Sequence, residues 1–71
     1  TTTIPFRNFF IHLEFEQVGH RAWMSRATIE DPVRAETSAV AMPEVHQTPH
    51  AAGVSVYRLA RMRIIKGTWR N

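Results

Sequence analysis

The sequence predicts a small α+β domain, in which one helix packs on one face of a single-layer antiparallel sheet of three strands, in the chain order ββαβ. Three observations lead to this fold class. Residues 9–29 contain two alternating apolar and polar segments with a glycine between them. An Asp-Pro step then precedes an alanine-rich stretch, and the last third of the chain alternates again. A length of 71 residues fits one domain spanning residues 1–71.

Residues 1–8 are expected to form an extended arm, because Pro5 cannot donate to a ladder and the threonines show no helical pattern. From residue 9 to 16, apolar side chains occupy the odd positions, and this period of two is typical of a strand. Gly19 suits a tight turn because it adopts positive φ without steric cost. Residues 21–29 resume the alternation, which predicts an antiparallel hairpin.

The middle of the chain carries a helix-start pattern. Asp31 can accept hydrogen bonds from free backbone N–H groups, and Pro32 suits the first helical position. Residues 33–42 lack glycine and proline, so we expect a helix of about three turns that ends before Pro43. Residues 43–53, bracketed by prolines and a glycine, are expected to form a long loop.

Residues 54–69 fit either kind of element. Their apolar and basic residues alternate around Arg61, which favours a strand, but residues 57–63 are good helix formers. We expect a strand, with a helix as the alternative. This last strand would lie beside the first strand of the hairpin, giving the order 2-1-3 with every neighbour antiparallel.

The charge is unevenly distributed along the chain. The formal net charge is +3 and the isoelectric point is near 10.7. Residues 1–44, however, carry more acids than bases, whereas residues 45–71 carry only bases. The chain is therefore two-signed rather than uniformly basic. It contains no cysteine, which excludes disulfides, thiolate metal sites and a cysteine nucleophile.

The basic C-terminal segment is a candidate contact for a polyanion or an acidic partner, since guanidinium groups pair with phosphate and carboxylate. An aromatic residue between cations could also stack on bases. The alternative is that these cations guard an exposed edge strand against aggregation. The candidate residues are Arg58, Arg61, Arg63, Lys66, Trp69 and Arg70.

One helix covers only one face of a sheet, so the other face is a candidate partner-binding surface, because mixed apolar and charged patches mark interfaces. The alternative hypothesis is that Ile4 and Phe6 of the arm, or Trp69, fold over this face and bury it. The candidate residues on this sheet face are Phe10, His12, Glu14, Met24 and Arg26.

No catalytic, metal or cofactor site is expected. His46 and His50 have zinc-pair spacing for a helix, but Pro49 lies between them in a stretch that we interpret as loop. Glu14 and Glu16 share a face, where a cross-strand charge pair is favoured over acid–base chemistry. The sequence contains neither a G-x-S-x-G nucleophile motif nor a glycine-rich phosphate loop.

Three features together resemble small phage and mobile-element accessory proteins, anti-CRISPR proteins among them. They are the hairpin over residues 9–29, the run from Arg26 to Pro32 that leads into an alanine-rich stretch, and the basic Met62-Arg63-Ile64. The resemblance implies a stoichiometric inhibitor or adaptor of a host protein or nucleoprotein complex. Members that mimic nucleic acid tend to be acidic, and this chain is not, which argues against mimicry.

The function predicted from the sequence is thus a non-enzymatic binding module, with a homodimer as an open alternative. A nucleic-acid-binding module and a small subunit of a large assembly are the other two readings. No apolar run approaches the roughly 20 residues that span a bilayer, so no membrane partner is expected. The N-terminal residues lack a signal-peptide pattern, and we expect a cytoplasmic protein.

Overall fold

The chain folds into one antiparallel sheet followed by one helix. The computed structural model describes residues 2–67, apart from the side chains of residues 42 and 43. Its elements are, in chain order, β1 (Thr2–Phe6), β2 (Phe9–Gly19), β3 (Ala22–Asp31), β4 (Glu36–His46) and α1 (Pro49–Lys66). The predicted class, α+β with an antiparallel sheet and a helix, is confirmed, whereas the ββαβ order of the elements is wrong.

The sheet is a meander in which each strand pairs with the next, in the order β1-β2-β3-β4. All three ladders are antiparallel, and the predicted hairpin over residues 9–29 corresponds to β2 and β3. The predicted order 2-1-3 is wrong, because the outer neighbour of β2 is β1 rather than the C-terminal segment. β1 spans five residues, and its pairing with β2 begins at Thr2↔Leu13.

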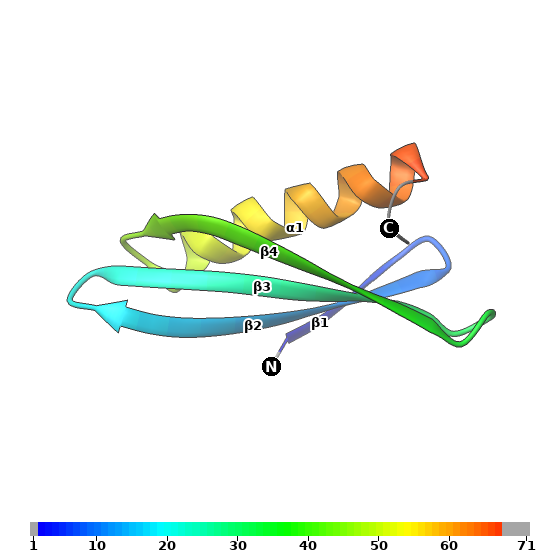
Figure 1. Cartoon of the computed structure of the whole chain (residues 1–71), viewed down its shortest axis with the longest axis horizontal. Helices are drawn as coiled ribbons and strands as arrows, with labels where there is room; N and C mark the ends of the chain where they lie inside the picture. The colour runs from blue at the N-terminus through cyan, green and yellow to red at the C-terminus, as the bar shows by residue number, and fades with distance from the viewer. Residues whose placement is uncertain (1, 68–71) are drawn as a thin grey trace.

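Helix α1 packs along one face of the sheet and contacts β2, β3 and β4 (Figure 1). Its first turns are attached to β3 by the hydroxyl of Ser25, which donates a 2.6 Å hydrogen bond to the carbonyl oxygen of Ala52. Gly53 lies against the ring of Phe15, so closely that an added Cβ would be 2.9 Å from Cε1. The helix therefore contacts the sheet through its backbone at Gly53 as well as through its side chains.

The core lies between this helix and the covered face of the sheet. Odd-numbered residues of β2 and β3 enter it, so the even-numbered residues of both strands point to the opposite face. Burying each aliphatic side chain contributes roughly 1.5–3 kcal/mol. The buried apolar residues that form this cluster are Ile11, Leu13, Ala27, Ile29, Val40, Val56, Ala60 and Ile64.

The predicted extended arm over residues 1–8 is largely a strand. Residues 2–6 pair with β2, and Ile4 and Phe6 pack against the core. Pro5 is compatible with this position, because β1 is an edge strand whose outer side needs no donor. The arm therefore extends the sheet and does not cross its open face.

The predicted helix over residues 33–42 is wrong, because this region contains a turn and the strand β4. Asp31 does act as a cap, accepting from the backbone N–H groups of Val33 and Arg34 at 3.1 and 3.3 Å. These bonds close only a turn, and Ala35 then adopts a left-handed φ of 57°. From residue 36 the chain returns along β3, where Val40 is buried, so tertiary packing overrides the helix propensity of the alanines.

The predicted strand over residues 54–69 is also wrong within the described residues, where the alternative, a helix, is found. Thr48 caps its start by accepting from the N–H of Ala51 at 3.1 Å, and Pro49 follows in the first turn. Gly67 ends it with a left-handed φ of 73° and donates to the carbonyls of Arg63 and Ile64. The predicted loop over residues 43–53 shrinks to a bend at residues 47–48.

The turn between β2 and β3 differs in detail from the prediction. Gly19 belongs to β2, and Arg21, not Gly19, adopts positive φ, at 55°. Arg7 does the same between β1 and β2, at 57°. Left-handed backbone costs about 1–2 kcal/mol for a residue with a Cβ, so both short turns carry strain.

Candidate binding surfaces

The sheet face turned away from α1, called here the uncovered face, brings together the five residues predicted from the sequence. Cross-strand register places Phe10 opposite Glu30, His12 opposite Thr28, and Glu14 opposite Arg26. Met24 lies opposite Glu16 one pair further along. The five residues share this face although the helix was expected elsewhere in the chain, because any single covering helix leaves the even-numbered positions of this hairpin outside. That they bind a partner stays a prediction.

The uncovered face is crossed by a chain of hydrogen-bonded side chains from three strands. Thr3 Oγ1 lies 2.9 Å from His12 Nδ1, and His12 Nε2 lies 2.7 Å from a carboxylate oxygen of Glu30. The side chains of His12 and Glu30 are 32% and 42% exposed. This relay holds the imidazole in one orientation and presents it on the surface rather than in a closed site.

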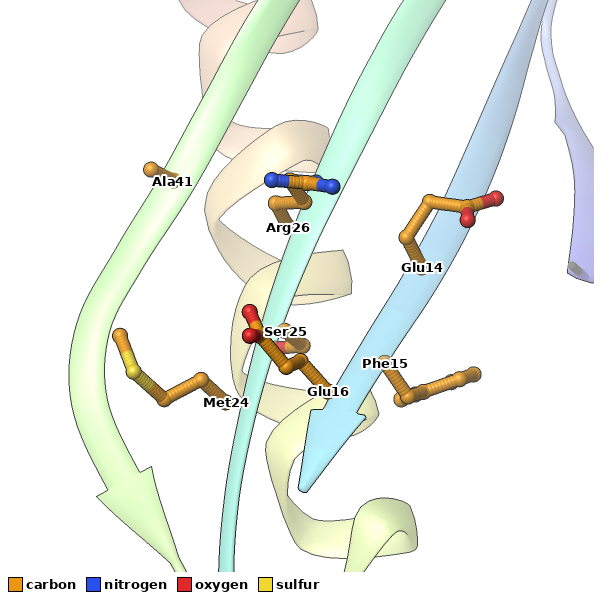
Figure 2. Close-up of a pocket in the computed structure, with 7 residues that line it drawn as sticks. All are labelled: Glu14, Phe15, Glu16, Met24, Ser25, Arg26 and Ala41. Carbon is orange, nitrogen blue, oxygen red and sulfur yellow. The ribbon is translucent and has the colours of Figure 1, made fainter. Parts of the chain in front are cut away.

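A shallow hollow of about 170 Å³ lies beside this relay on the uncovered face (Figure 2). Two glutamates, an arginine, a methionine and an alanine surround it, so it offers both signs of charge and an apolar patch. These groups bind by ion pairs, hydrogen bonds and apolar contact. The residues of this face around the hollow are Glu14, Glu16, Met24, Arg26 and Ala41.

The rival interpretation, in which the N-terminal arm buries this face, is excluded for Ile4 and Phe6. Both side chains pack against the core on the helix side of the sheet. Trp69, the other predicted cover, lies outside the described residues. Phe10 of the uncovered face is 39% exposed, which leaves an aromatic side chain accessible there.

The basic residues predicted to contact a partner lie, where the structure describes them, on helix α1, and they are distributed over different sides of that helix. Arg58, Arg61 and Lys66 are exposed on α1, while Arg63 is half-buried. Trp69 and Arg70 lie outside the described residues. The predicted role in guarding an edge strand no longer applies to the four helical cations, because they are not on a strand.

Arg61 is drawn toward the edge of the sheet by two aromatic rings. Its guanidinium carbon lies 5.2 Å from the centroid of the Phe6 ring and 5.8 Å from that of Tyr57. Arg7 approaches the same Phe6 ring at 5.3 Å. Sequence reasoning missed Arg7 as a member of the basic surface, because only the folded β1 brings it beside α1.

A second cavity, an apolar groove of about 240 Å³, lies between the β1–β2 side of the sheet and α1. Leu13 and Phe15 line it from β2, and Gly53, Val54 and Tyr57 line it from the helix. No local sequence pattern points to this groove, because its walls are β2 and α1, and the residues of α1 are expected from the sequence to form a loop followed by a strand.

The surroundings of Asp31 perturb its ionisation. Burial opposes its charge, but hydrogen bonds from the Arg34 side chain and from the backbone N–H groups of Arg34 and Val33 outweigh this, so its pKa lies below the ordinary value. Arg34 Nη1 donates to Asp31 Oδ2 at 2.8 Å. This pair secures the β3–β4 turn.

Histidines do not converge in the described part of the chain. His46 is on β4 and His50 is in the first turn of α1, so the helical spacing between them is not realised. Among residues 2–67 no group of three or more histidine, aspartate and glutamate side chains is placed to hold a metal ion. The helix within that range is not long and apolar enough to cross a membrane.

Comparison with known proteins gives no relative from which a function could be carried over. No family model matches the chain, and neither a curated protein nor a solved structure matches it.

Proposed function

We propose that the chain is a small non-enzymatic binding module whose uncovered face docks on a partner protein or nucleoprotein complex. The observation that carries the proposal is that the two faces of the sheet differ. One face is closed by α1, and the other presents an accessible Phe10 together with Met24, Glu14 and Arg26. An exposed surface of this mixed composition is typical of an interface.

The composition of this face suits a protein partner. Phe10 supplies a rigid aromatic anchor, and Met24 supplies a flexible apolar contact that adapts to an opposing surface. Charges of both signs around them favour one orientation and disfavour partners of uniform charge. Small size supports a stoichiometric inhibitor or adaptor, the role found among the phage accessory proteins that the sequence resembles.

The size of the two hollows found among the described residues supports the non-enzymatic part of the proposal. The hollows described above measure about 170 and 240 Å³. Small-molecule sites usually have volumes of several hundred cubic ångström and enclose most of the ligand. Both hollows are open, and the side chains around them lack a nucleophile positioned by a base.

The test uses a photo-crosslinking amino acid placed on the uncovered face and, as a matched control, away from it. Thr28 lies at the centre of this face opposite His12, while Val33 is 82% exposed on the β3–β4 turn. We expect the Thr28 variant to crosslink a defined partner in cells that contain the protein naturally, and the Val33 variant to give none. Nuclease treatment before irradiation should leave the product intact.

A crosslink obtained only from Val33, or lost after nuclease treatment, would contradict the proposal. Phe10→Ser should independently weaken the captured complex by about tenfold or more, as expected for removal of a buried aromatic anchor. Val33→Ser is the control and should leave the affinity unchanged. Circular dichroism of both variants verifies that the fold is retained.

Nucleic-acid binding is a second candidate, favoured by the helix. The 18 residues of α1 include four cations and no acid. Arg58 and Lys66 are exposed and are available for phosphate contacts. Binding to a DNA duplex should then weaken with salt, with a logarithmic slope of about −0.9 per phosphate contacted. Reversing both charges to glutamate should abolish binding, whereas Arg21→Glu in the β2–β3 turn should not.

A further inference from the structure

Strand β4 forms one margin of the sheet, and within residues 2–67 no strand pairs with its outer side (Figure 1). We call this side the outer edge of β4. It presents backbone N–H and C=O groups to an incoming strand. β4 spans 11 residues, whereas β1 at the other margin spans five. Thr37, Ala39 and Ala41 are exposed, so this edge is accessible over much of its length.

The outer edge of β4 lacks the features that usually protect an edge from pairing. Proteins protect edges with short strands, charged side chains, proline or bulges. β1 is short and contains Pro5. The part of β2 that extends beyond β1 carries Glu16 and has an irregularity after Gln17. Residues 37–42 of β4 contain neither a charged residue nor a proline. β4 is therefore better suited than β1 or β2 to pair with a further strand.

The regular part of β4 is bounded symmetrically. Its register with β3 is continuous over residues 36–42 and shifts beyond them. Ala35, just before this segment, has a left-handed φ of 57°. Pro43, just after it, has no backbone N–H to donate. Ala39 is the midpoint, with both boundary residues four positions away. Two copies of the segment, paired antiparallel about this midpoint, therefore match each other from end to end.

We propose that the outer edge of β4 pairs with the same edge of a second copy of this chain, antiparallel and about a two-fold axis at Ala39. All ladders described in this sheet are antiparallel, and a two-fold axis perpendicular to the sheet generates one more of the same kind. The segment can supply about six to eight backbone hydrogen bonds between the copies. The opposed residues at its centre are Ala39 and Ala39, Ser38 and Val40, and Thr37 and Ala41.

The charges at the ends of this pairing fit a second copy. The two-fold register brings the end of β4 that carries Glu44 beside the β3–β4 turn of the other copy, where Arg34 lies. Glu44 is exposed, and the Arg34 side chain is 54% exposed although one of its nitrogens donates to Asp31. Symmetry makes this contact twice. Glu36 falls opposite Met42, so no acid opposes another acid along the segment.

Pairing of this kind would join the uncovered faces of the two copies into one surface. A two-fold axis perpendicular to the sheet keeps both helices on the opposite face. The inference does not rest on the proposed docking function, because dimerisation is measured on the isolated protein, whereas docking requires a partner.

Sedimentation equilibrium of the isolated protein tests the pairing, and we expect a reversible monomer–dimer equilibrium. Ala39→Lys and Ala39→Glu each place like charges opposite one another at the two-fold axis, so each should weaken dimerisation at least about tenfold. An equimolar mixture of the two variants should dimerise again, because opposite charges then face each other. That recovery also shows that both variants fold. Gln17→Lys, on the exposed end of β2, is the matched control and should leave the equilibrium unchanged.

A disulfide identifies the residues that face each other. The chain contains no cysteine, so a bond formed by Ala39→Cys joins two copies. Opposed Cα atoms of an antiparallel ladder are about 4.5–5.5 Å apart, a distance that a disulfide spans. Mild oxidation should convert Ala39→Cys fully to the linked dimer and Gln17→Cys only slowly. A protein that stays monomeric at millimolar concentration, a mixture that does not dimerise, or faster linkage at position 17 would overturn the proposal.

Discussion

The contact between Gly53 and Phe15 leads to a quantitative prediction that can be tested with a double-mutant cycle. Alanine in the middle of a helix is favoured over glycine by about 1 kcal/mol. In this helix, however, the added Cβ would lie 2.9 Å from Phe15 Cε1 and 3.3 Å from Cζ. The ring must move aside, and overpacking of this kind costs about 1–3 kcal/mol. We expect Gly53→Ala to destabilise the protein by about 1 kcal/mol.

The same substitution should stabilise a chain in which the ring is removed. Phe15→Leu lacks both clashing atoms, so Gly53→Ala in that background should raise the free energy of unfolding by up to about 1 kcal/mol. The coupling between the two sites is then about 2 kcal/mol. Urea unfolding at 25 °C, followed by circular dichroism at 222 nm, measures all four proteins. Equal effects of Gly53→Ala in the two backgrounds would refute the steric argument.

Three further substitutions have defined outcomes in the same unfolding assay. Ser25→Ala removes the buried hydrogen bond to the carbonyl of Ala52 and should lower the free energy of unfolding by about 1 kcal/mol. Ala35→Gly relieves a φ of 57° and should raise it by about 0.5–1 kcal/mol. Asp31 has a lowered pKa, so its contribution is present at neutral pH and is lost as the pH falls from about 4 through the folded-state pKa. Asp31→Asn should remove that acid-dependent loss.

Each of these has a matched comparison. Ser38→Ala, a half-buried serine on β4, should cost less than Ser25→Ala, and equal losses would argue against the hydrogen bond. Ala39→Gly, in the middle of β4, should lower the free energy of unfolding. A rise in the free energy of unfolding for Ala35→Gly would then report the backbone strain at Ala35. An unchanged acid profile in Asp31→Asn would show that other carboxylates govern acid unfolding.

The sequence was sufficient to predict β2 and β3, because alternation with a period of two is a local signal that both strands carry over many residues. It was misleading for the second half of the chain. Alanines, which favour helices, lie in β4, while Val56 and Ile64, which favour strands, lie in α1. Packing against the sheet decides both cases, and neighbours in space are not visible in a local pattern.

Signals for the helix were nevertheless present. Ala52, Val56, Ala60 and Ile64 are four residues apart, which is the spacing of one helical face. Thr48-Pro49 before them and Gly67 after them are start and stop residues. The Asp31-Pro32 step is the same kind of start signal, but it lies in a turn. Capping residues therefore indicate a helix only when apolar residues with helical spacing follow them.

The candidate surfaces differ in how far they could be predicted. Which residues lie on the uncovered face depends only on the hairpin register and on the presence of one helix, so the sequence places them there, while their role in binding stays a prediction. The basic residues were assigned to a strand and are instead spread around a helix, which separates Arg63 from Arg58. The groove beside β2 requires β1 and α1 together, whereas the sequence predicts an extended arm in place of β1 and a helix only as the alternative in place of α1.

The position of α1 at the end of the element order affects synthesis of the chain. The strands join through short turns, so hairpins can form while later residues are still being translated. Val56, Ala60 and Ile64, which complete the core, emerge only afterwards. Until then Ile11, Ile29 and Val40 line a sheet with both faces open to water. A nascent chain of this protein therefore passes through a stage at which chaperones, or a neighbouring nascent chain, compete with its own helix for the same surface.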